Sequence, residues 1–301
     1  MYKKILVPLD GSKTAENALL PARFLARRLE LPVQLLSVID LTELARGVSA
    51  AEGLYLDGLV ANETRTGEEY LAQIAKTFSG VGVQWLVARG KAADVIIEKA
   101  AVDAATLIAM ATHGRSGLNR FLLGSVAEKI LRGAASPLLL VRATEGAETE
   151  GEAAFKSIVV PLDGSETAES VLPAVVEMAQ RLDSEVVLFR AYNVSHRIYG
   201  GDDGRDPAIV ADLIGGIRRA ARDYLEKKTA ELRERGVKKV RYILNEGLSA
   251  DQIIALARQT PDNLIVMGSH GRSGIKRWVL GSVTETVVRH SGDPVLVLRT
   301  S

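Results

Sequence analysis

The chain contains the same stretch of sequence twice, and this internal repeat limits its possible folds more than any other feature. Residues 2–16 (YKKILVPLDGSKTAE) and residues 155–169 (FKSIVVPLDGSETAE) are identical at 11 of 15 positions. Residues 111–131 likewise match residues 268–288, near the other end of each half. Because self-similarity at a fixed spacing indicates repeated folding units, the sequence predicts two copies of one domain, at residues 1–143 and 155–301.

The segment between the two copies differs from both of them in composition. Residues 144–154 (TEGAETEGEAA) contain no large apolar side chain, which is typical of a solvated linker. The whole chain of 301 residues is about twice as long as a typical domain of roughly 100–200 residues. Each half is therefore long enough to bury a core of its own.

Short apolar runs alternate with amphipathic stretches in both halves, which favours an α/β fold. Residues 4–9 indicate a buried strand, and Leu19, Leu20, Phe24, Leu25 and Leu29 then fall on one face of a helix. Strands separated by helices imply right-handed crossovers and a parallel sheet, and uninterrupted apolar strands indicate burial on both faces. The remaining predicted strands are residues 33–39, 83–88, 106–111, 137–141, 157–162, 186–191, 240–244, 264–268 and 294–298, with helices over 58–78, over 92–101 and from Ser125.

Composition excludes several classes of function. A formal net charge of +1 gives no broad cationic surface for a nucleic acid or a membrane, and the absence of cysteine excludes disulfides, thiol catalysis and cysteine-ligated zinc. No run of 18 uncharged apolar residues predicts a membrane span, and no signal peptide is recognisable, so we expect a cytoplasmic protein. No Gly-Lys-Ser/Thr phosphate loop follows a strand, and no Gly-x-Gly-x-x-Gly follows the first strand, which disfavours P-loop NTPases and NAD enzymes.

The glycine-rich segment after the fourth strand of each half is the strongest functional signal. In the second half it contains Gly268, Gly271, Gly281 and Ser282, with Arg272 adding positive charge. Glycines let backbone amides approach a ligand, and the first amides of the helix that follows favour an anion. Because ligands of such sheets bind beyond the carboxyl ends of the strands, we expect a polyphosphate here.

A purely structural interpretation of the same segment stays open. Residues 125–128 (SVAE) and 282–285 (SVTE) both fit a capping box, in which the serine satisfies the helix amides by itself. His113 and His270 follow the fourth strands, where a histidine more often has a structural than a catalytic role. Asp10 and Asp163, in PLDGS, either form a turn and cap a helix or contact a ribose hydroxyl and Mg²⁺.

With these motifs the chain resembles the universal stress proteins in their tandem form, from Tyr2 to Arg142 and from Phe155 to Arg299. The ATP-binding branch of that family has Gly, two residues, Gly, nine residues, and then Gly with Ser or Thr. Gly268, Gly271, Gly281 and Ser282 match this spacing, whereas Ala111 replaces the leading glycine before Gly114, Gly124 and Ser125.

The resemblance implies an adenine nucleotide alpha hydrolase-like fold, with a five-stranded parallel sheet per domain and the domains paired through their last strands. It implies one site for ATP (or ADP or AMP) with Mg²⁺ in each half, the metal lying at Asp10 and Asp163. The implied site residues are Pro8, Asp10, Val38, Ile39, Gly90, Met110, Ala111, His113, Gly114, Arg115, Gly124, Ser125 and Val126, and then Pro161, Asp163, Ala191, Tyr192, Gly247, Met267, Gly268, His270, Gly271, Arg272, Gly281, Ser282 and Val283.

Three functions remain open on the sequence. The first is a nucleotide-binding stress-response or signalling module, and the second is a slow ATPase or a phosphoryl or nucleotidyl transferase that uses the same sites. The third is a scaffold that binds no nucleotide. We expect an internal pseudo-dimer, because the apolar last strands at 137–141 and 294–298 would otherwise be exposed edges. A homodimer of chains and a protein partner are also compatible with the sequence, which identifies neither.

Overall fold

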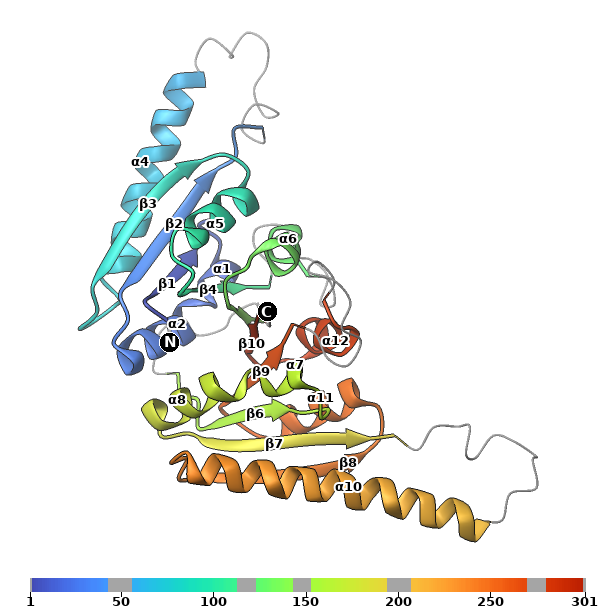
Figure 1. Ribbon diagram of the computed structural model, residues 1–301. Helices are drawn as coiled ribbons and strands as arrows, with labels where there is room; N and C mark the ends of the chain where they lie inside the picture. Colours follow the sequence, from blue (N-terminus) through green and yellow to red (C-terminus); the bar gives the residue numbers. More distant parts are fainter. Residues whose placement is uncertain are drawn as a thin grey trace. The chain divides into compact units, whose positions relative to one another are not determined.

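The computed structural model describes residues 2–42, 56–112, 123–142, 153–193, 207–269 and 280–299. The chain forms two compact units, which divide it mainly between Ala154 and Phe155 (Figure 1). Each unit has an α/β fold in which a parallel sheet carries helices on its faces.

In the first unit, the central strand of the sheet is the first strand of the chain. The strand order is β3-β2-β1-β4-β5, and every described pair is parallel. The strands are β1 (Lys4–Pro8), β2 (Val33–Ile39), β3 (Val83–Arg89), β4 (Thr106–Ala111) and β5 (Leu138–Val141), and the helices are α1 (Lys13–Glu16), α2 (Leu19–Leu29), α4 (Leu56–Ala75), α5 (Ala92–Ala101) and α6 (Ser125–Gly133).

The second unit repeats this arrangement. Its strand order is β10-β9-β6-β7-β8, and β6 pairs in parallel with both β7 and β9. The strands are β6 (Ser157–Pro161), β7 (Glu185–Tyr192), β8 (Val240–Glu246), β9 (Asn263–Gly268) and β10 (Val295–Leu298), and the helices are α7 (Glu166–Glu169), α8 (Leu172–Leu182), α10 (Pro207–Glu234), α11 (Ser249–Gln259) and α12 (Ser282–His290).

The helices follow from their apolar periodicity. α2 buries Leu19, Ala22, Leu25 and Leu29, whose spacings of three and four residues form one stripe, whereas Leu20 and Phe24 flank that stripe and are only half-buried. The helix ends where Glu30 adopts a left-handed conformation with φ of 55°, and α8 ends in the same way at Asp183, with φ of 54°.

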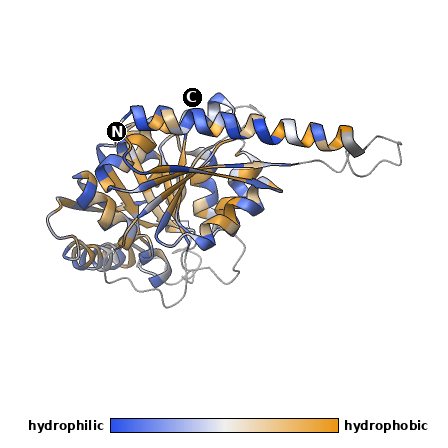
Figure 2. Ribbon diagram, turned by 90° about the horizontal axis from the view of Figure 1, so that it is seen from below, coloured by the Kyte–Doolittle hydropathy of each residue, from blue (hydrophilic) through white to orange (hydrophobic). Residues whose placement is uncertain are grey.

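The same helices cover corresponding strands in the two units. In the first unit α4 packs on β2 and β3, while α5 packs on α6. Right-handed crossovers account for this. α2 and α4 lie in connections that run toward β3, whereas α5 and α6 lie in connections that run toward β5, so the two pairs cover opposite faces of the sheet. α10, with 28 residues, is longer than its counterpart α4, with 20, and its first turns extend past the strands it covers (Figure 2).

The core lies along the strands, which are coloured mainly hydrophobic in Figure 2. All six residues of β4 and all six of β9 are buried. The prediction that every strand is covered on both faces is wrong for β3, in which Trp85 is 46% exposed and Leu86 is 36% exposed. The reason is its position at the edge of the sheet, where coverage is incomplete.

In the part of the chain that the structure describes, no helix is both long enough and apolar enough to cross a membrane.

Candidate functional site

The order of the strands reverses beside the first strand of each unit. β1 lies between β2 and β4, and β6 lies between β7 and β9. The connection from β1 therefore leaves toward one side of the sheet, and the connection from β4 leaves toward the other. The gap between two such connections, at the carboxyl ends of the strands, is where open α/β sheets bind ligands.

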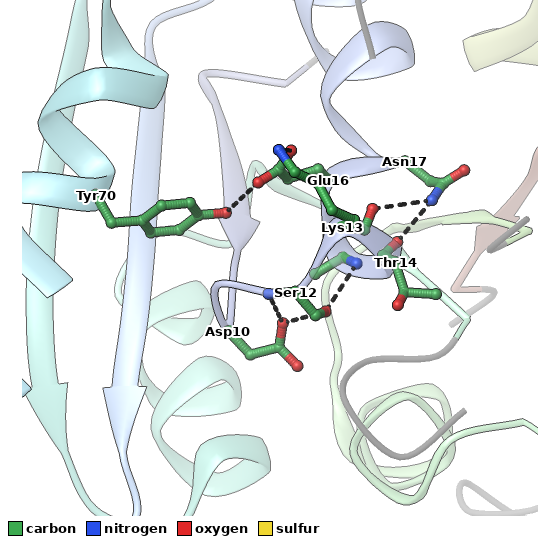
Figure 3. A network of polar contacts seen from close by, with 8 residues as sticks. Asp10, Ser12, Lys13, Thr14, Glu16, Asn17 and Tyr70 are labelled. Carbon is green, nitrogen blue, oxygen red and sulfur yellow. Dashed lines mark hydrogen bonds and ion pairs between the residues drawn. The ribbon is translucent and has the colours of Figure 1, made fainter. Parts of the chain in front are cut away.

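Asp10 organises the turn that follows β1 (Figure 3). Its Oδ1 accepts hydrogen bonds from the Ser12 amide at 2.9 Å and from the Ser12 hydroxyl at 2.6 Å. Ser12 in turn caps α1 by accepting a hydrogen bond from the Ala15 amide at 3.1 Å. Gly11 between them has φ of 82°, a left-handed conformation that favours glycine.

The turn after β6 has the same geometry. Asp163 Oδ1 accepts from the Ser165 amide at 2.9 Å and from the Ser165 hydroxyl at 2.6 Å, and Ser165 caps α7. The structural role that the sequence offered for these aspartates is thus present in both units. The roles of Asp10 and Asp163 toward ribose or Mg²⁺ stay a prediction.

The last helix of each unit begins beside the end of the fourth strand. In the first unit the Gly124 amide donates to the Thr112 carbonyl at 2.8 Å, and the Thr112 amide donates to the Val141 carbonyl at 2.8 Å. In the second unit the Gly281 amide donates to the Ser269 carbonyl at 2.8 Å. These bonds hold the amino ends of α6 and α12 against the same edge of the sheet as the aspartates.

The capping-box interpretation of these helix starts is wrong. Gly124 and Gly281 are the N-cap residues, so Ser125 and Ser282 lie in the first helical turn, and neither N-cap makes a side-chain capping bond. The glutamate that would complete each box instead accepts from an arginine one turn later, Arg132 to Glu128 at 3.2 Å and Arg289 to Glu285 at 2.9 Å. Among the described residues, neither N-cap can cap the first amides of its helix with a side chain, and such a helix start suits an anion.

One glycine follows the third strand of each unit, at the carboxyl end of the sheet. Gly90 and Gly247 both have φ of 138°, which side chains rarely permit. The Gly90 amide donates to the Ile39 carbonyl at 3.0 Å, and the Gly247 amide donates to the Tyr192 carbonyl at 3.0 Å. Both glycines thus contact the end of the second strand, where the resemblance implies the site residues Ile39 and Tyr192.

Ala111 does not disturb the backbone of the first site. It is the last residue of β4, and its counterpart Gly268 is the last residue of β9. Gly268 is not one of the described glycines with a positive φ, so the position is extended and accepts an alanine without strain.

Most other predicted residues lie at the same edge of the sheets, although their contact with a ligand remains a prediction. They lie at strand ends (Pro8, Val38, Ile39, Met110, Pro161, Ala191, Tyr192 and Met267) or in the first turn of the closing helices (Val126 and Val283). His113, Gly114, Arg115, His270, Gly271 and Arg272 fall outside the described residues. Within the described ranges, no three His, Asp or Glu side chains form a cluster that could hold a metal ion.

One pair of polar residues beside each turn was not identified from the sequence. The Tyr70 hydroxyl donates to Glu16 at 3.2 Å (Figure 3), and the Tyr224 hydroxyl donates to Glu169 at 2.8 Å. Each bond joins the second long helix of a unit to the short helix after the aspartate. The similar separations of 54 and 55 residues in the two halves are the signal that could have revealed it.

Comparison with known proteins agrees with this architecture. A universal stress protein from Methanocaldococcus jannaschii, MJ0531, is 31% identical over 149 residues, which cover 50% of this chain and 85% of that protein. A universal stress protein from Mycolicibacterium smegmatis is 25% identical over 306 residues, which cover 98% of this chain and 96% of that protein. The crystal structure of a universal stress protein from Archaeoglobus fulgidus has the same fold, with a TM-score of 0.69 at 20% identity, covering 100% of this chain and 98% of that one.

The family model described as "Universal stress protein family" matches residues 1–142 and again residues 154–299. These two matches include nearly the whole chain. The chain therefore belongs to the universal stress protein family, with two of its domains in tandem.

Proposed function

We propose that each half of this chain binds one adenine nucleotide, ATP or its products ADP and AMP, with Mg²⁺. In this proposal the protein is a stress-response or signalling module whose partner binding depends on nucleotide occupancy. The two sites belong to the domains at residues 1–143 and 155–301. A universal stress protein has been solved in complex with cAMP, which is a property of that protein. The proposal for this chain depends on its own residues.

The observation that carries the proposal is the start of the closing helices. α6 and α12 each begin at a glycine N-cap without a side-chain capping bond, next to the carboxyl ends of β4 and β9. The first amides of a helix have no acceptor within the helix, and together with the positive end of the helix dipole they favour a phosphate at such a point. Asp10 and Asp163 follow the neighbouring strands, and one carboxylate with nucleotide phosphates is a common way to hold Mg²⁺.

The experiment that tests the proposal fills each helix start with a carboxylate. In Gly124→Asp and Gly281→Asp, the new carboxylate would accept hydrogen bonds from the first helix amides and would repel a phosphate. The backbone conformations of these N-caps, with φ of −58° and −61°, suit an aspartate, so the fold should be retained. Calorimetric titration with ATP and Mg²⁺ should give two sites in the wild type, one in each single variant and none in the double variant.

The isosteric variants Gly124→Asn and Gly281→Asn are the matched controls. Asparagine caps a helix nearly as well as aspartate but adds no negative charge. It should therefore weaken nucleotide binding less than aspartate does, at an equal melting temperature. A wild type that binds no adenine nucleotide would refute the proposal and favour the scaffold, whereas steady release of phosphate from ATP would favour the slow ATPase.

A further inference from the structure

The second unit contains a cavity that lies away from the proposed nucleotide site. α10 packs on β8 (Figure 1), and a cavity of about 270 Å³ between them is lined by Glu226, Thr229 and Arg233 of α10 and by Arg241 and Tyr242 of β8. Arg241 and Tyr242 are the second and third residues of β8, whereas Gly247 follows its last residue. The cavity therefore lies toward the opposite end of this strand from the proposed nucleotide site.

A buried hydroxyl in the lining has no hydrogen-bond partner. Thr229 is 4% exposed, and its Oγ1 makes no hydrogen bond to any described residue. Buried polar atoms in proteins nearly always have a partner, because a buried group without one is unfavourable. A ligand in this cavity with a polar atom next to Thr229 would supply that partner.

The cavity offers one charge of each sign to a ligand. Glu226, Thr229 and Arg233 are spaced by three and four residues, so they lie on one side of α10 with the hydroxyl between the two charges. The third charged residue of the lining, Arg241, forms an ion pair with Glu185 at 3.1 Å. Since successive residues of a strand point to opposite faces and Tyr242 bonds to α10, the Arg241 side chain points away from α10.

Both charged side chains are held in place and can form further hydrogen bonds. Glu226 accepts one described hydrogen bond, from the Tyr242 hydroxyl at 2.8 Å, and a carboxylate can accept several. Arg233 donates one, from Nη2 to the Val240 carbonyl at 3.2 Å, and a guanidinium has several more donors. The hydrogen bond to Glu226 raises the pKa of Tyr242, so the phenol keeps its proton at neutral pH and remains a donor.

We propose that this cavity binds a small zwitterion in which a short chain separates an ammonium from a carboxylate group, as in an ω-amino acid. The ammonium would donate to Glu226, the carboxylate would accept from the Arg233 guanidinium, and either group could bond to Thr229 between them. Glu226 and Arg233 begin about 10.5 Å apart along the helix axis, which favours separated charges over the adjacent charges of an α-amino acid. The volume lies just below the roughly 300–1,000 Å³ of pockets for drug-sized ligands, which suits a molecule of a few carbons.

The first unit lacks the equivalent side chains. Counted from the tyrosine that bonds to the short helix of each unit, Ala72 and Ala75 of α4 occupy the positions of Glu226 and Thr229 of α10. These positions of α4 thus carry neither the carboxylate nor the hydroxyl. The proposed site belongs to the second unit, and binding should saturate at one ligand per chain.

The experiment compares three ligands of nearly equal size on the full chain. γ-Aminobutyrate carries both charges, butyrate lacks the ammonium group, and butylamine lacks the carboxylate. Each ligand is titrated against the protein and followed by NMR, through saturation transfer to the ligand and through the Nε–Hε resonance of Arg233. γ-Aminobutyrate should bind at least about tenfold more tightly than either analogue, as expected for one additional charge-assisted hydrogen bond.

Three variants test the lining residues separately. Glu226→Gln keeps an acceptor for Tyr242 and should lower the affinity for γ-aminobutyrate to that of butyrate, while Arg233→Gln should lower it to that of butylamine. Thr229→Val keeps the shape of the side chain without its hydroxyl. It should weaken binding about threefold or more and leave the melting temperature of the unliganded chain unchanged or higher, because no hydrogen bond is lost.

Glu234→Gln and Arg235→Gln are the matched controls, because these exposed residues at the end of α10 do not line the cavity. They should leave all three affinities unchanged. No binding of γ-aminobutyrate, or an affinity equal to that of its analogues, would overturn the inference. So would a preference for γ-aminobutyrate that survives both Glu226→Gln and Arg233→Gln. These titrations contain no nucleotide, so their failure would leave the proposed function intact.

Discussion

A single methyl group at Gly90 should damage the first site. Its φ of 138° lies in a region that costs a side chain about 1–3 kcal/mol. An added Cβ would also lie 2.9 Å from Val95 Cγ2, and a valine in the first turns of a helix has little rotamer freedom with which to move away. The overlap should cost a similar amount, so Gly90→Ala should destabilise the first unit by about 2–6 kcal/mol in total.

The equivalent substitution should destabilise the second unit less than Gly90→Ala destabilises the first. The two effects can be compared within one chain. Gly247 has the same φ, but the atom nearest to an added Cβ is Gln252 Nε2 at 2.8 Å, the end of a flexible side chain. Gly247→Ala should therefore cost mainly the backbone strain, about 1–3 kcal/mol. Gly58→Ala, with no atom within 4 Å of the added methyl, is the control and should stabilise α4 slightly.

Hydrogen–deuterium exchange measured by mass spectrometry suits this comparison, because it reports the opening free energy of each unit separately. Gly90→Ala should speed exchange in β3 and α5. It should also weaken nucleotide binding at the first site alone, because the strained turn would no longer hold the hydrogen bond from the amide of residue 90 to the Ile39 carbonyl. Exchange in β8 and α11 should stay at the wild-type rate. A smaller effect for Gly90→Ala than for Gly247→Ala would refute the reasoning, because the two positions share their φ and differ in the rigidity of the neighbouring side chain.

Three further predictions concern stability. Asn263 is buried and donates to the Ala257 and Thr260 carbonyls and to Asp293 at 2.9 Å, so Asn263→Ala should destabilise the second unit by about 2–4 kcal/mol in urea denaturation, and an unchanged midpoint would contradict this. Its counterpart Thr106 has a buried hydroxyl without a hydrogen-bond partner among the described residues, so Thr106→Val should be neutral or stabilising in the same assay. Burial raises the pKa of Glu169, but hydrogen bonds from Lys228 and Tyr224 outweigh it and lower the pKa below 4.5. This carboxylate therefore stabilises the unit at neutral pH, and the contribution is lost as the pH falls through about 4.5 and below. Lys228→Met should destabilise the unit by about 1–2 kcal/mol at pH 7 and should flatten the acid side of the profile of melting temperature against pH.

The strands could be predicted to within one or two residues, because apolar runs bounded by glycine, proline and aspartate mark buried parallel strands. The last strands begin at Leu138 and Val295 rather than at the prolines before them. A proline has no amide to donate, although the carbonyls of Pro137 and Pro294 still accept from Ile108 and Ile265. The exposure of β3 could not be predicted, since an edge strand and a central strand of a parallel sheet have similar apolar sequences.

Much of the site geometry followed from motifs that act locally. The aspartate turns and the glycine helix starts involve residues close in sequence, so their spacing alone indicates their structure. The capping boxes failed for the same local reason, because a shift of one residue in the start of the helix moves the serine out of the N-cap position. The Tyr224–Glu169 contact could not be predicted from one half, because its partners are 55 residues apart and meet only through the fold.

The duplication explains why the two sites can differ without loss of the fold. Backbone features are the same in both halves, namely the left-handed glycine after each aspartate, the glycine with φ of 138°, and the glycine at the start of the closing helix. The differences fall on side chains, with Ala111 opposite Gly268 and, in the helices over the third strands, Ala72 opposite Glu226. A change in such a side chain leaves the turn geometry in place, so the ligand preference of one half can change while its sheet and helices keep the same packing. A chain with two separate halves can therefore keep one site unchanged while the charge at the other site changes.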